Sequence, residues 1–295
     1  MSLTLFLQQL INGISLGSLY ALIAIGYTMV YGILRLINFA HGDLLMVSAY
    51  AAIYGILLFS LPWYFSFPLA IAVTGAMGIL LDRAAYKPLR QAPRISLLIS
   101  AIGASFLLEN LALVLIGGVP KPFPRPDFFS SVIQLGEIRV QVLTLYTPLI
   151  TMLLVSALLY IVYRTKAGKA MRAASRDFEA TRLMGINLDR IIALTFLLGS
   201  CLAAAGGIMW AMKYPQVNPF MGIIPGLKAF IAAVVGGIGN ITGAVIGGFL
   251  LGMGEILIVA FMPGAAQYRD AFAFLVLILV LLFRPTGIMG EHLSE

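Results

Sequence analysis

The sequence predicts an all-α, polytopic membrane protein with about eight transmembrane or partly spanning helices, including broken or re-entrant segments. Of its 295 residues, 61% are hydrophobic and only 11% are charged, which is too little charge to cover the surface of a soluble domain. Long apolar runs recur from end to end, whereas the short alternating strands of a transmembrane barrel are absent. We therefore expect residues 1–295 to form a single transmembrane domain.

The first half of the chain contains five apolar segments that cross or partly cross the bilayer. They are about Leu5–Val30, Leu44–Ser60, Ser66–Leu81, Ile95–Ile116 and Leu143–Tyr163. The loop at 82–94 carries four basic residues, so the positive-inside rule places it in the cytoplasm. The proline-rich loop at 118–142 mixes charge signs and is expected outside. Two spans separate the loop at 82–94 from a second basic segment at 164–190, which puts both on the same side.

The second half contains three further long spans and one short apolar segment. The long spans are about Ile191–Met212, Gly243–Phe261 and Ala271–Phe283, and Lys213–Gly222 forms an external turn. Leu227–Val235 is too short to cross, because a full span takes roughly 20 residues. We expect the tail from Arg284 in the cytoplasm, which requires residues 227–240 to dip and turn back inward of the midplane.

The side of the N-terminus depends on how residues 35–43 fold. If Leu5–Val30 is the only crossing before Arg35, the N-terminus lies outside. If the chain instead breaks in mid-membrane at Asn38–Asp43, it lies inside. The break is the preferred reading, because a His and an Asp beside Gly make a poor interfacial loop but a reasonable cavity lining.

Arg164–Arg190 is crowded with charge although it lies between two apolar spans. Within it, apolar or small residues recur at spacings of four and three, which places them on one side of a helix. These residues are Ala167, Met171, Ala174, Phe178 and Thr181. Anionic lipid headgroups would account for the charge alone. The apolar side of the helix instead predicts docking against an apolar partner surface.

The same segment contains the signals that end this helix and begin the next one. Arg172, Arg176 and Glu179 fall on a face different from the apolar one. Gly185 is suited to end the helix, because glycine tolerates the left-handed conformation found there. Asp189 is expected to cap the following helix.

Two breaks between apolar segments are candidates to line a solute pathway. In the first, Asn38, His41 and Asp43 would supply polar groups to water or solute; an ordinary loop with Asp43 as helix cap is the alternative. The second is the GGIGN turn, which comprises Gly236, Gly237 and Gly239. Structural packing of a re-entrant turn is the alternative there. Glu109 and Glu255 also fall within apolar spans and are expected to be paired with other protein groups.

The sequence offers no catalytic constellation, no metal site and no cofactor motif. One of only two histidines, without a matching base or nucleophile, cannot assemble an active site, so no enzyme is expected. Cys201 is the only cysteine, which excludes a disulfide and a thiolate metal site. No GxxxxGK[ST] motif occurs, so another polypeptide must bind any nucleotide that drives transport. The net charge of +7 arises from inter-helix loops and does not indicate nucleic-acid binding.

Six blocks that follow one another along nearly the whole chain carry a family resemblance. They are YALIAIGYTMVYGILRLINFAHGD, LLISAIG, GKAMRAASRDFEATRLMGIN, IALTF, LKAFIAAVVGGIGNITGAVIGG and LVLILVLLFRPTGIMG. Together they resemble the LivH-type permease subunit of branched-chain amino acid ABC importers. The resemblance implies a multi-pass permease of the bacterial inner membrane that translocates leucine, isoleucine and valine.

The same resemblance implies partners and site residues. The partners would be two ATP-binding subunits that hold the ATP, a sister permease forming a heterodimer, and a periplasmic binding protein. Arg164–Arg190 is similar to the EAA coupling loop of other ABC permeases, with Glu179-Ala180 in place of the EAA triplet. The residues expected to couple to the ATPase are Met171, Arg172, Ala174, Arg176, Phe178, Glu179, Ala180, Gly185 and Ile186.

Other functions remain open at this stage. An ABC permease for urea, amides or other amino acids would have a similar sequence, since the binding protein would set selectivity. A stand-alone secondary transporter or channel would usually need an ion-binding carboxylate pair, and the sequence offers no good candidate. A membrane enzyme is a further alternative, but the sequence offers no set of catalytic residues for one.

Overall fold

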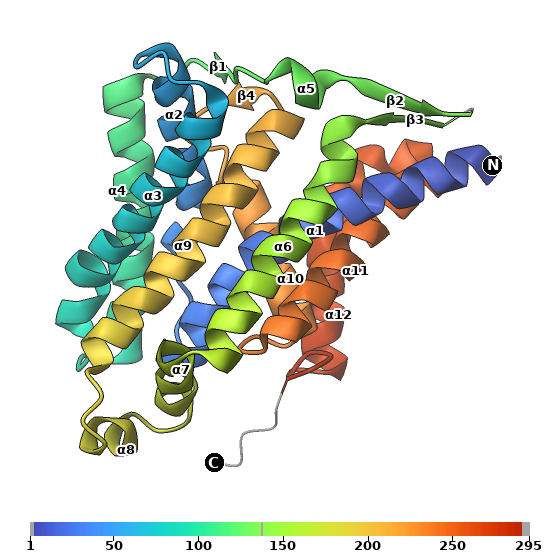
Figure 1. Ribbon diagram of the computed structural model, residues 1–295. Helices are drawn as coiled ribbons and strands as arrows, with labels where there is room; N and C mark the ends of the chain where they lie inside the picture. The colour runs from blue at the N-terminus through green and yellow to red at the C-terminus, as the bar shows by residue number, and fades with distance from the viewer. Residues whose placement is uncertain (1–2, 137, 291–295) are drawn as a thin grey trace.

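The computed structural model describes residues 3–136 and 138–290, and the chain is almost entirely helical (Figure 1). The helices are α1 (Leu3–Leu34), η1 (Phe39–His41), α2 (Asp43–Leu57), α3 (Trp63–Leu81), η2 (Asp82–Tyr86), η3 (Lys87–Leu89), α4 (Arg94–Ile116), α5 (Asp127–Ser130), α6 (Val142–Arg164), α7 (Lys166–Arg176), α8 (Phe178–Leu183), α9 (Leu188–Lys213), α10 (Ile223–Gly236), α11 (Ile241–Phe261), η4 (Pro263–Tyr268) and α12 (Arg269–Phe283). Eight of the described helical stretches are long and apolar enough to cross a membrane. The predicted fold class is confirmed.

Figure 1 shows the short strands at one end of the bundle and α7 and α8 at the other. The strands are β1 (Lys121–Pro122), β2 (Val132–Leu135), β3 (Ile138–Gln141) and β4 (Gln216–Val217); β1 pairs with β4 and β2 with β3, both antiparallel. The basic segments lie at the α7 and α8 end, which the positive-inside rule makes cytoplasmic. The strand end is therefore the outer end. The hairpin β2–β3 was not foreseen in the sequence, where residues 118–142 were expected only as a loop.

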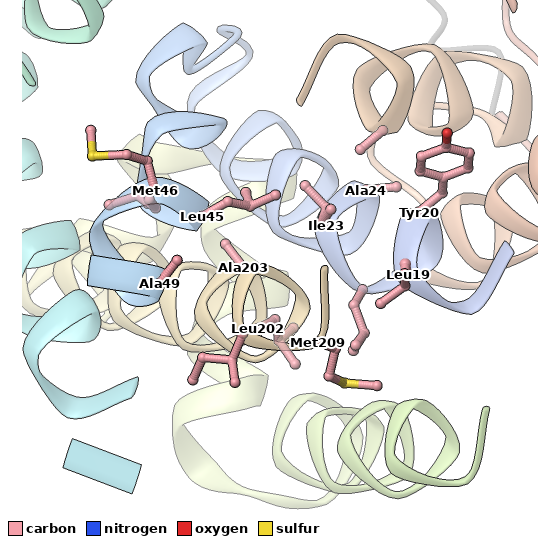
Figure 2. Packing of buried hydrophobic residues seen from close by; sticks show 14 of the residues in the cluster. Leu19, Tyr20, Ile23, Ala24, Leu45, Met46, Ala49, Leu202, Ala203 and Met209 are labelled. Atoms are coloured by element: carbon pink, nitrogen blue, oxygen red, sulfur yellow. The ribbon is translucent and has the colours of Figure 1, made fainter. Parts of the chain in front are cut away.

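Helix α1 is the central element of the fold, because nearly all residues of its membrane-spanning stretch are buried inside the protein. Its Leu19, Ile23 and Ala24 belong to one buried cluster with residues of α2 and α9, and Ile23 lies between those two helices (Figure 2). The residues opposite them in the same view are Leu45, Met46 and Ala49 of α2 and Leu202, Ala203 and Met209 of α9. Small residues let these helices approach closely, which matters in lipid because apolar burial there gives little driving force between helices.

The first of two broken crossings follows α1. Arg35 lies at the cytoplasmic end, where its guanidinium donates to the carbonyl oxygen of Ser175 at 3.3 Å. The chain then returns into the bundle without helix as far as Asn38, and η1 follows. In η1, Nε2 of His41 lies 3.2 Å from the carbonyl oxygen of Ile23. From Asp43, α2 completes the crossing to the outer end. The predicted mid-membrane break is thus present, but it belongs to the second crossing and not to the first.

The N-terminal end of α1 lies at the outer end of the bundle. The side-chain amide of Gln8 donates to the carbonyl oxygen of Arg139 in the outer hairpin at 3.2 Å. The preferred reading, with the N-terminus on the cytoplasmic side, is therefore wrong. That prediction treated a full first crossing and a break at Asn38–Asp43 as alternatives. In the structure both occur, because α1 crosses completely and a separate broken crossing follows it. No Lys or Arg precedes Arg35, so the sequence lacked the charge that normally orients such a span.

The second broken crossing runs from α9 to α10 in the opposite sense. After β4 the chain enters the bundle without helix as far as Gly222, and α10 continues to Gly236. The backbone N–H of Met289 donates to the carbonyl oxygen of Gly236 at 2.9 Å, which places the end of α10 beside the C-terminal segment. The segment 227–240 therefore reaches the cytoplasmic end, where α11 begins.

A buried ionic cluster ties α10 to α11 and α12. The Nζ of Lys228 lies 2.9 Å from Oε1 of Glu255 and 2.7 Å from Oδ1 of Asp270. Tyr20 donates its hydroxyl to Glu255 at 3.1 Å, and Arg269 lies 4.0 Å from the same carboxylate. Lys228 and Glu255 are both almost completely buried. Glu255 is thus paired structurally, as the sequence led us to expect.

Replacing Lys228 with Met is expected to destabilise the protein by about 3–5 kcal/mol, because it leaves Glu255 buried without its main counter-ion. Thermal unfolding of the purified full chain in detergent measures this loss. The double variant Lys228→Met with Glu255→Gln should recover part of the stability, and Lys169→Met, at an exposed position of α7, should have little effect. An unchanged melting temperature for Lys228→Met alone would contradict the role given to the cluster.

Candidate functional site

The two broken crossings meet inside the bundle, where the first turns of α2 and α10 lie against each other. A Cβ added to Gly42 would lie 2.8 Å from the carbonyl oxygen of Gly222, so the two backbones are in direct contact. Beside this contact lies a cavity of about 220 Å³, walled on its other side by α4. Its lining residues are Tyr27, Phe39, Gly42, Asp43, Ile102, Ser105, Phe106, Glu109, Gly222, Ile223, Gly226 and Leu227.

Asp43 is the polar residue of the first break that faces this cavity. Its side chain is nearly buried and accepts a hydrogen bond of 2.5 Å from the Ser105 hydroxyl. Glu109, one helical turn further along α4, lines the same cavity. Intramembrane carboxyl groups usually face protein or water rather than lipid, and these two do so at the junction of two helix breaks. The Glu109 partner was not identified from the sequence.

Asn38 and His41 do not line the cavity. Asn38 accepts a 2.6 Å hydrogen bond from the buried hydroxyl of Tyr86. His41 contacts the Ile23 carbonyl, and its ring packs edge-on against Tyr27 with centroids 4.6 Å apart. Both side chains are about 1% exposed, so they hold the non-helical backbone in place rather than reach solute. Of the three polar residues predicted in this break, the structure brings only Asp43 to the cavity.

The GGIGN turn lies at the cytoplasmic end of the second broken crossing, far along α10 from the cavity. Gly236 packs directly on the backbone of Gly243 in α11, and Gly237 packs on Gly290. Gly239 has a φ of +101° and lines a different, cytoplasmic cavity. Gly236 and Gly237 therefore serve to pack the turn against neighbouring backbone, and of the three glycines only Gly239 borders a cavity.

The charged segment forms two short helices instead of the single helix expected before Gly185. Helix α7 is capped at its start by Thr165, whose hydroxyl accepts from the backbone N–H of Gly168, and Asp177 is its C-cap. Asp177 then caps α8 by accepting from the N–H of Ala180 at 3.0 Å. Gly185 has a φ of +76° and ends α8, as predicted.

The apolar side of α7 packs inward. Met171 is 4% and Ala174 1% exposed, and both join a buried cluster with residues of α1, α9 and η2. The expectation that these two side chains contact another protein is therefore wrong. Helical periodicity identified the buried side correctly, but it could not say that the chain itself supplies the partner surface. Arg172 is half-buried against the Tyr163 ring, and Ile186 also packs on this cluster.

The exposed apolar surface of the segment lies on α8 and just after it. Leu183 and Met184 are 87% and 81% exposed, and Phe178 is 36% exposed. Arg176, Glu179, Ala180 and Gly185 are exposed around them. We call the three residues Phe178, Leu183 and Met184 the α8 edge. Sequence reasoning missed Leu183 and Met184, although two large apolar residues directly before a helix-ending glycine in a polar segment were a usable signal.

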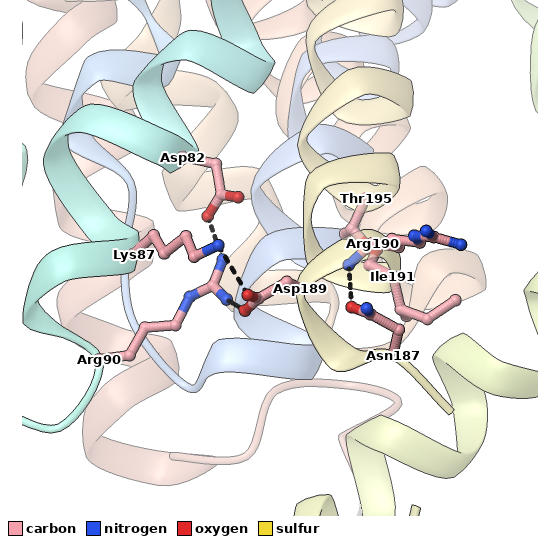
Figure 3. Close-up of polar contacts among 8 residues, drawn as sticks. All are labelled: Asp82, Lys87, Arg90, Asn187, Asp189, Arg190, Ile191 and Thr195. Atoms are coloured by element: carbon pink, nitrogen blue, oxygen red, sulfur yellow. Dashed lines mark hydrogen bonds and ion pairs between the residues drawn. The ribbon is translucent and has the colours of Figure 1, made fainter. Parts of the chain in front are cut away.

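An ionic network joins the segment that contains η2 and η3 to the first turn of α9, shortly after α8 (Figure 3). The Asp189 carboxylate lies 2.7 Å from Nζ of Lys87 and 2.5 Å from the guanidinium of Arg90, which also pairs with the buried Asp82 at 2.5 Å. Asn187, not Asp189 as predicted, caps α9 by accepting from the N–H of Arg190. The prediction that Asp189 caps α9 is wrong, because its carboxylate pairs with Lys87 and Arg90 of the other basic loop. The two basic loops are thereby joined into one cytoplasmic platform that presents the α8 edge.

The sequence of this chain matches a known protein family and several named relatives. The family described as "Branched-chain amino acid transport system / permease component" matches residues 9–281. The "High-affinity branched-chain amino acid transport system permease protein BraD" of Pseudomonas aeruginosa is 43% identical over 299 residues, covering 97% of this chain and 96% of the relative. The corresponding protein LivH of Escherichia coli is 41% identical with the same coverage.

Among solved structures, PsaBC from Streptococcus pneumoniae in complex with Fab has a similar fold. The TM-score is 0.50 at 13% sequence identity, with 96% of this chain and 92% of that chain covered. At this identity the likeness concerns the fold alone. With a family match over residues 9–281 and 41–43% identity along 97% of its length, the chain belongs to the branched-chain amino acid transport system permease components.

Proposed function

We propose that this chain is the membrane subunit of an ABC importer in the bacterial inner membrane that translocates leucine, isoleucine and valine. A periplasmic binding protein delivers the amino acid, and two separate ATP-binding subunits hold and hydrolyse the ATP. A sister permease completes the pathway. The observation that carries the proposal is the α8 edge, where Leu183 and Met184 are exposed at the cytoplasmic end of the bundle. Exposed large apolar side chains mark a protein or membrane contact, and the exposed charged residues around these two at the cytoplasmic end favour a protein partner.

We propose that the junction of the two broken crossings changes conformation during transport. Non-helical backbone at membrane depth is tolerated where it lines a cavity, and such breaks are common at solute pathways. Asp43 and Glu109 place two carboxyl groups beside the cavity at this junction. A displacement of α8 on ATP binding would pass through α7 to α1 and then to the adjoining segment 35–42. In this way the coupling surface and the cavity act on the same broken crossing.

The test is uptake of labelled leucine into proteoliposomes that contain this chain together with the ATP-binding subunits, the sister permease and the binding protein encoded beside it. We expect uptake that requires both ATP and the binding protein. Uptake by this chain alone without ATP would instead establish a stand-alone transporter. If urea or an amide competes with leucine at the binding protein and is itself imported, the solute assignment is wrong while the importer class stands.

Asp43→Asn is expected to lower the maximal uptake rate at least tenfold while leaving the affinity of the binding protein for leucine unchanged. The amide keeps the size of the side chain but replaces one oxygen of the carboxyl group that accepts from Ser105 and lines the cavity with an N–H donor. Asp127→Asn, in the outer loop on α5, is the matched control and should transport normally. Equal rates for both variants would show that the cavity is not part of the pathway.

A further inference from the structure

A groove of about 440 Å³ lies at the cytoplasmic end of the bundle, between the end of α3 and the start of α9. Its lining residues all come from residues 79–87 and 187–197, so it is separate from the cavity at the helix junction and from the α8 edge. The proposed transport function gives this groove no role.

The groove changes from charged to apolar along the direction that leads into the membrane. Arg83, directly after α3, and Arg190, in the first turn of α9, line its cytoplasmic part. The deeper part of the lining is aliphatic and consists of Ile79, Ala193, Leu194 and Leu197. Leu197 follows Arg190 by seven positions, which is about 10 Å along a helix. The apolar part therefore lies within the membrane-spanning stretches of α3 and α9.

Two acidic residues also line the groove, and both are already paired. Lys87 and Arg90 form ion pairs with Asp189, and Arg90 also pairs with the buried Asp82 (Figure 3). These contacts join the segment after α3 to the first turn of α9 and compensate the two carboxylates. The negative charge of the groove is therefore balanced before a ligand is considered.

Arg83 and Arg190 are the basic residues of the groove that remain for a ligand. Both are exposed, and neither side chain has an ion pair or a hydrogen bond within residues 3–136 and 138–290. A guanidinium has five N–H donors in a planar arrangement that matches the oxygens of a phosphate group. The cytoplasmic part of the groove is therefore suited to an anionic group with several acceptor oxygens.

An anionic phospholipid matches both parts of the groove. Its phosphate supplies the acceptor oxygens for charge-assisted hydrogen bonds at the arginines, and an acyl chain covers the aliphatic part at membrane depth. Free phosphate would leave the aliphatic part uncovered. A soluble protein partner stays outside the bilayer and so does not reach Leu197. Basic pockets between transmembrane helices on the cytoplasmic side are a recurring kind of site for anionic headgroups.

We infer that the groove between α3 and α9 binds one anionic phospholipid of the cytoplasmic leaflet. The phosphate lies at Arg83 and Arg190, and an acyl chain follows Ala193 and Leu197. The lipid bridges the two segments that the ion pairs of Asp189 already join, so its binding stabilises the folded permease. This binding does not depend on the proposed transport function.

The experiment titrates the purified full chain in detergent with phosphatidylglycerol and measures the dissociation constant by native mass spectrometry. Phosphatidylethanolamine, whose ammonium group neutralises its phosphate, is expected to bind at least tenfold more weakly. Arg83→Gln and Arg190→Gln should each weaken phosphatidylglycerol binding about fivefold, since each removes one basic residue near the headgroup. Arg83→Lys and Arg190→Lys keep the charge and should retain most of the affinity. Arg164→Gln, at an exposed arginine that does not line the groove, is the control and should bind like the wild type.

The apolar part of the groove is tested separately. Ala193→Phe places a ring where the acyl chain lies and is expected to weaken phosphatidylglycerol binding at least fivefold. Thermal unfolding without added lipid shows whether this variant is folded. With lipid, phosphatidylglycerol should raise the melting temperature of the wild type more than that of the double variant Arg83→Gln with Arg190→Gln.

Four outcomes would overturn the inference. Equal phosphatidylglycerol binding by Arg83→Gln, Arg190→Gln and Arg164→Gln would place the lipid elsewhere, and equal affinity for phosphatidylethanolamine would leave only unspecific lipid contact. Full displacement of the lipid by equimolar glycerol 1-phosphate would reduce the groove to a site for soluble anions. Loss of co-purifying ATP-binding subunits from the double variant, with lipid binding retained, would make it a protein contact. Since the titration measures no transport, a failure here leaves the proposed import function standing.

Discussion

Leu183→Asp is expected to reduce ATP-dependent leucine uptake at least tenfold without unfolding the permease. Leu183 is 87% exposed, so the substitution removes no internal packing. In the assembled importer the same side chain would be buried against an ATP-binding subunit, where loss of an apolar anchor and burial of a charge cost about 2 kcal/mol or more. Proteoliposome uptake and co-purification of the ATP-binding subunits measure the two consequences.

The control for this variant is Val119→Asp, which introduces the same charge at a 78% exposed apolar residue of the outer loop. It should leave both uptake and co-purification unchanged. If Leu183→Asp transports as well as Val119→Asp, the α8 edge is not a coupling surface. Thermal unfolding of each purified variant separates loss of assembly from loss of fold.

Gly222→Ala is expected to destabilise the permease by about 1–3 kcal/mol and to abolish most uptake, because overpacking in a rigid contact forces the backbone to move. A Cβ at this position would overlap the carbonyl group of Gly42, which is backbone and cannot rotate away. The substitution therefore separates the first turns of α2 and α10 and opens the junction of the two broken crossings.

Gly103→Ala is the matched control for Gly222→Ala, because nothing lies within 4 Å of a Cβ at Gly103. Alanine also favours a helix interior relative to glycine, so this variant should be at least as stable as the wild type. The melting temperature and the initial uptake rate are the two measurements. Equal values for the two variants would remove the argument that the crossings meet at a close backbone contact.

The sequence was sufficient for the fold class, because hydropathy and loop charge determine which segments are buried in lipid. It also identified Gly185 as a helix end and placed a break near Asp43, since these depend on local backbone chemistry. It could not orient α1, whose neighbourhood carries no basic residue before Arg35. It could not reveal the β2–β3 hairpin either, because short outer strands gain their order from pairing with each other and not from a hydrophobic pattern.

The candidate site was harder to predict, because its residues are defined by long-range contacts. Asn38 and Asp43 are five positions apart and both polar. The Asn38 side chain nevertheless accepts a hydrogen bond from Tyr86, whereas the Asp43 side chain lines the cavity. Glu109 becomes relevant only when α4 is known to lie beside α2. Met171 and Leu183 show the same limit, since helical periodicity finds an apolar face but does not say what covers it.

The most direct test of the coupling mechanism is photo-crosslinking from single introduced cysteines. Cys201, the only native cysteine, is first replaced by serine, and Leu183→Cys or Val119→Cys, both at exposed positions, is then labelled with a benzophenone maleimide in the assembled importer. We predict crosslinking of an ATP-binding subunit from position 183 and none from position 119 in the outer loop. Equal crosslinking from the two positions, or only lipid adducts from position 183, would contradict the account.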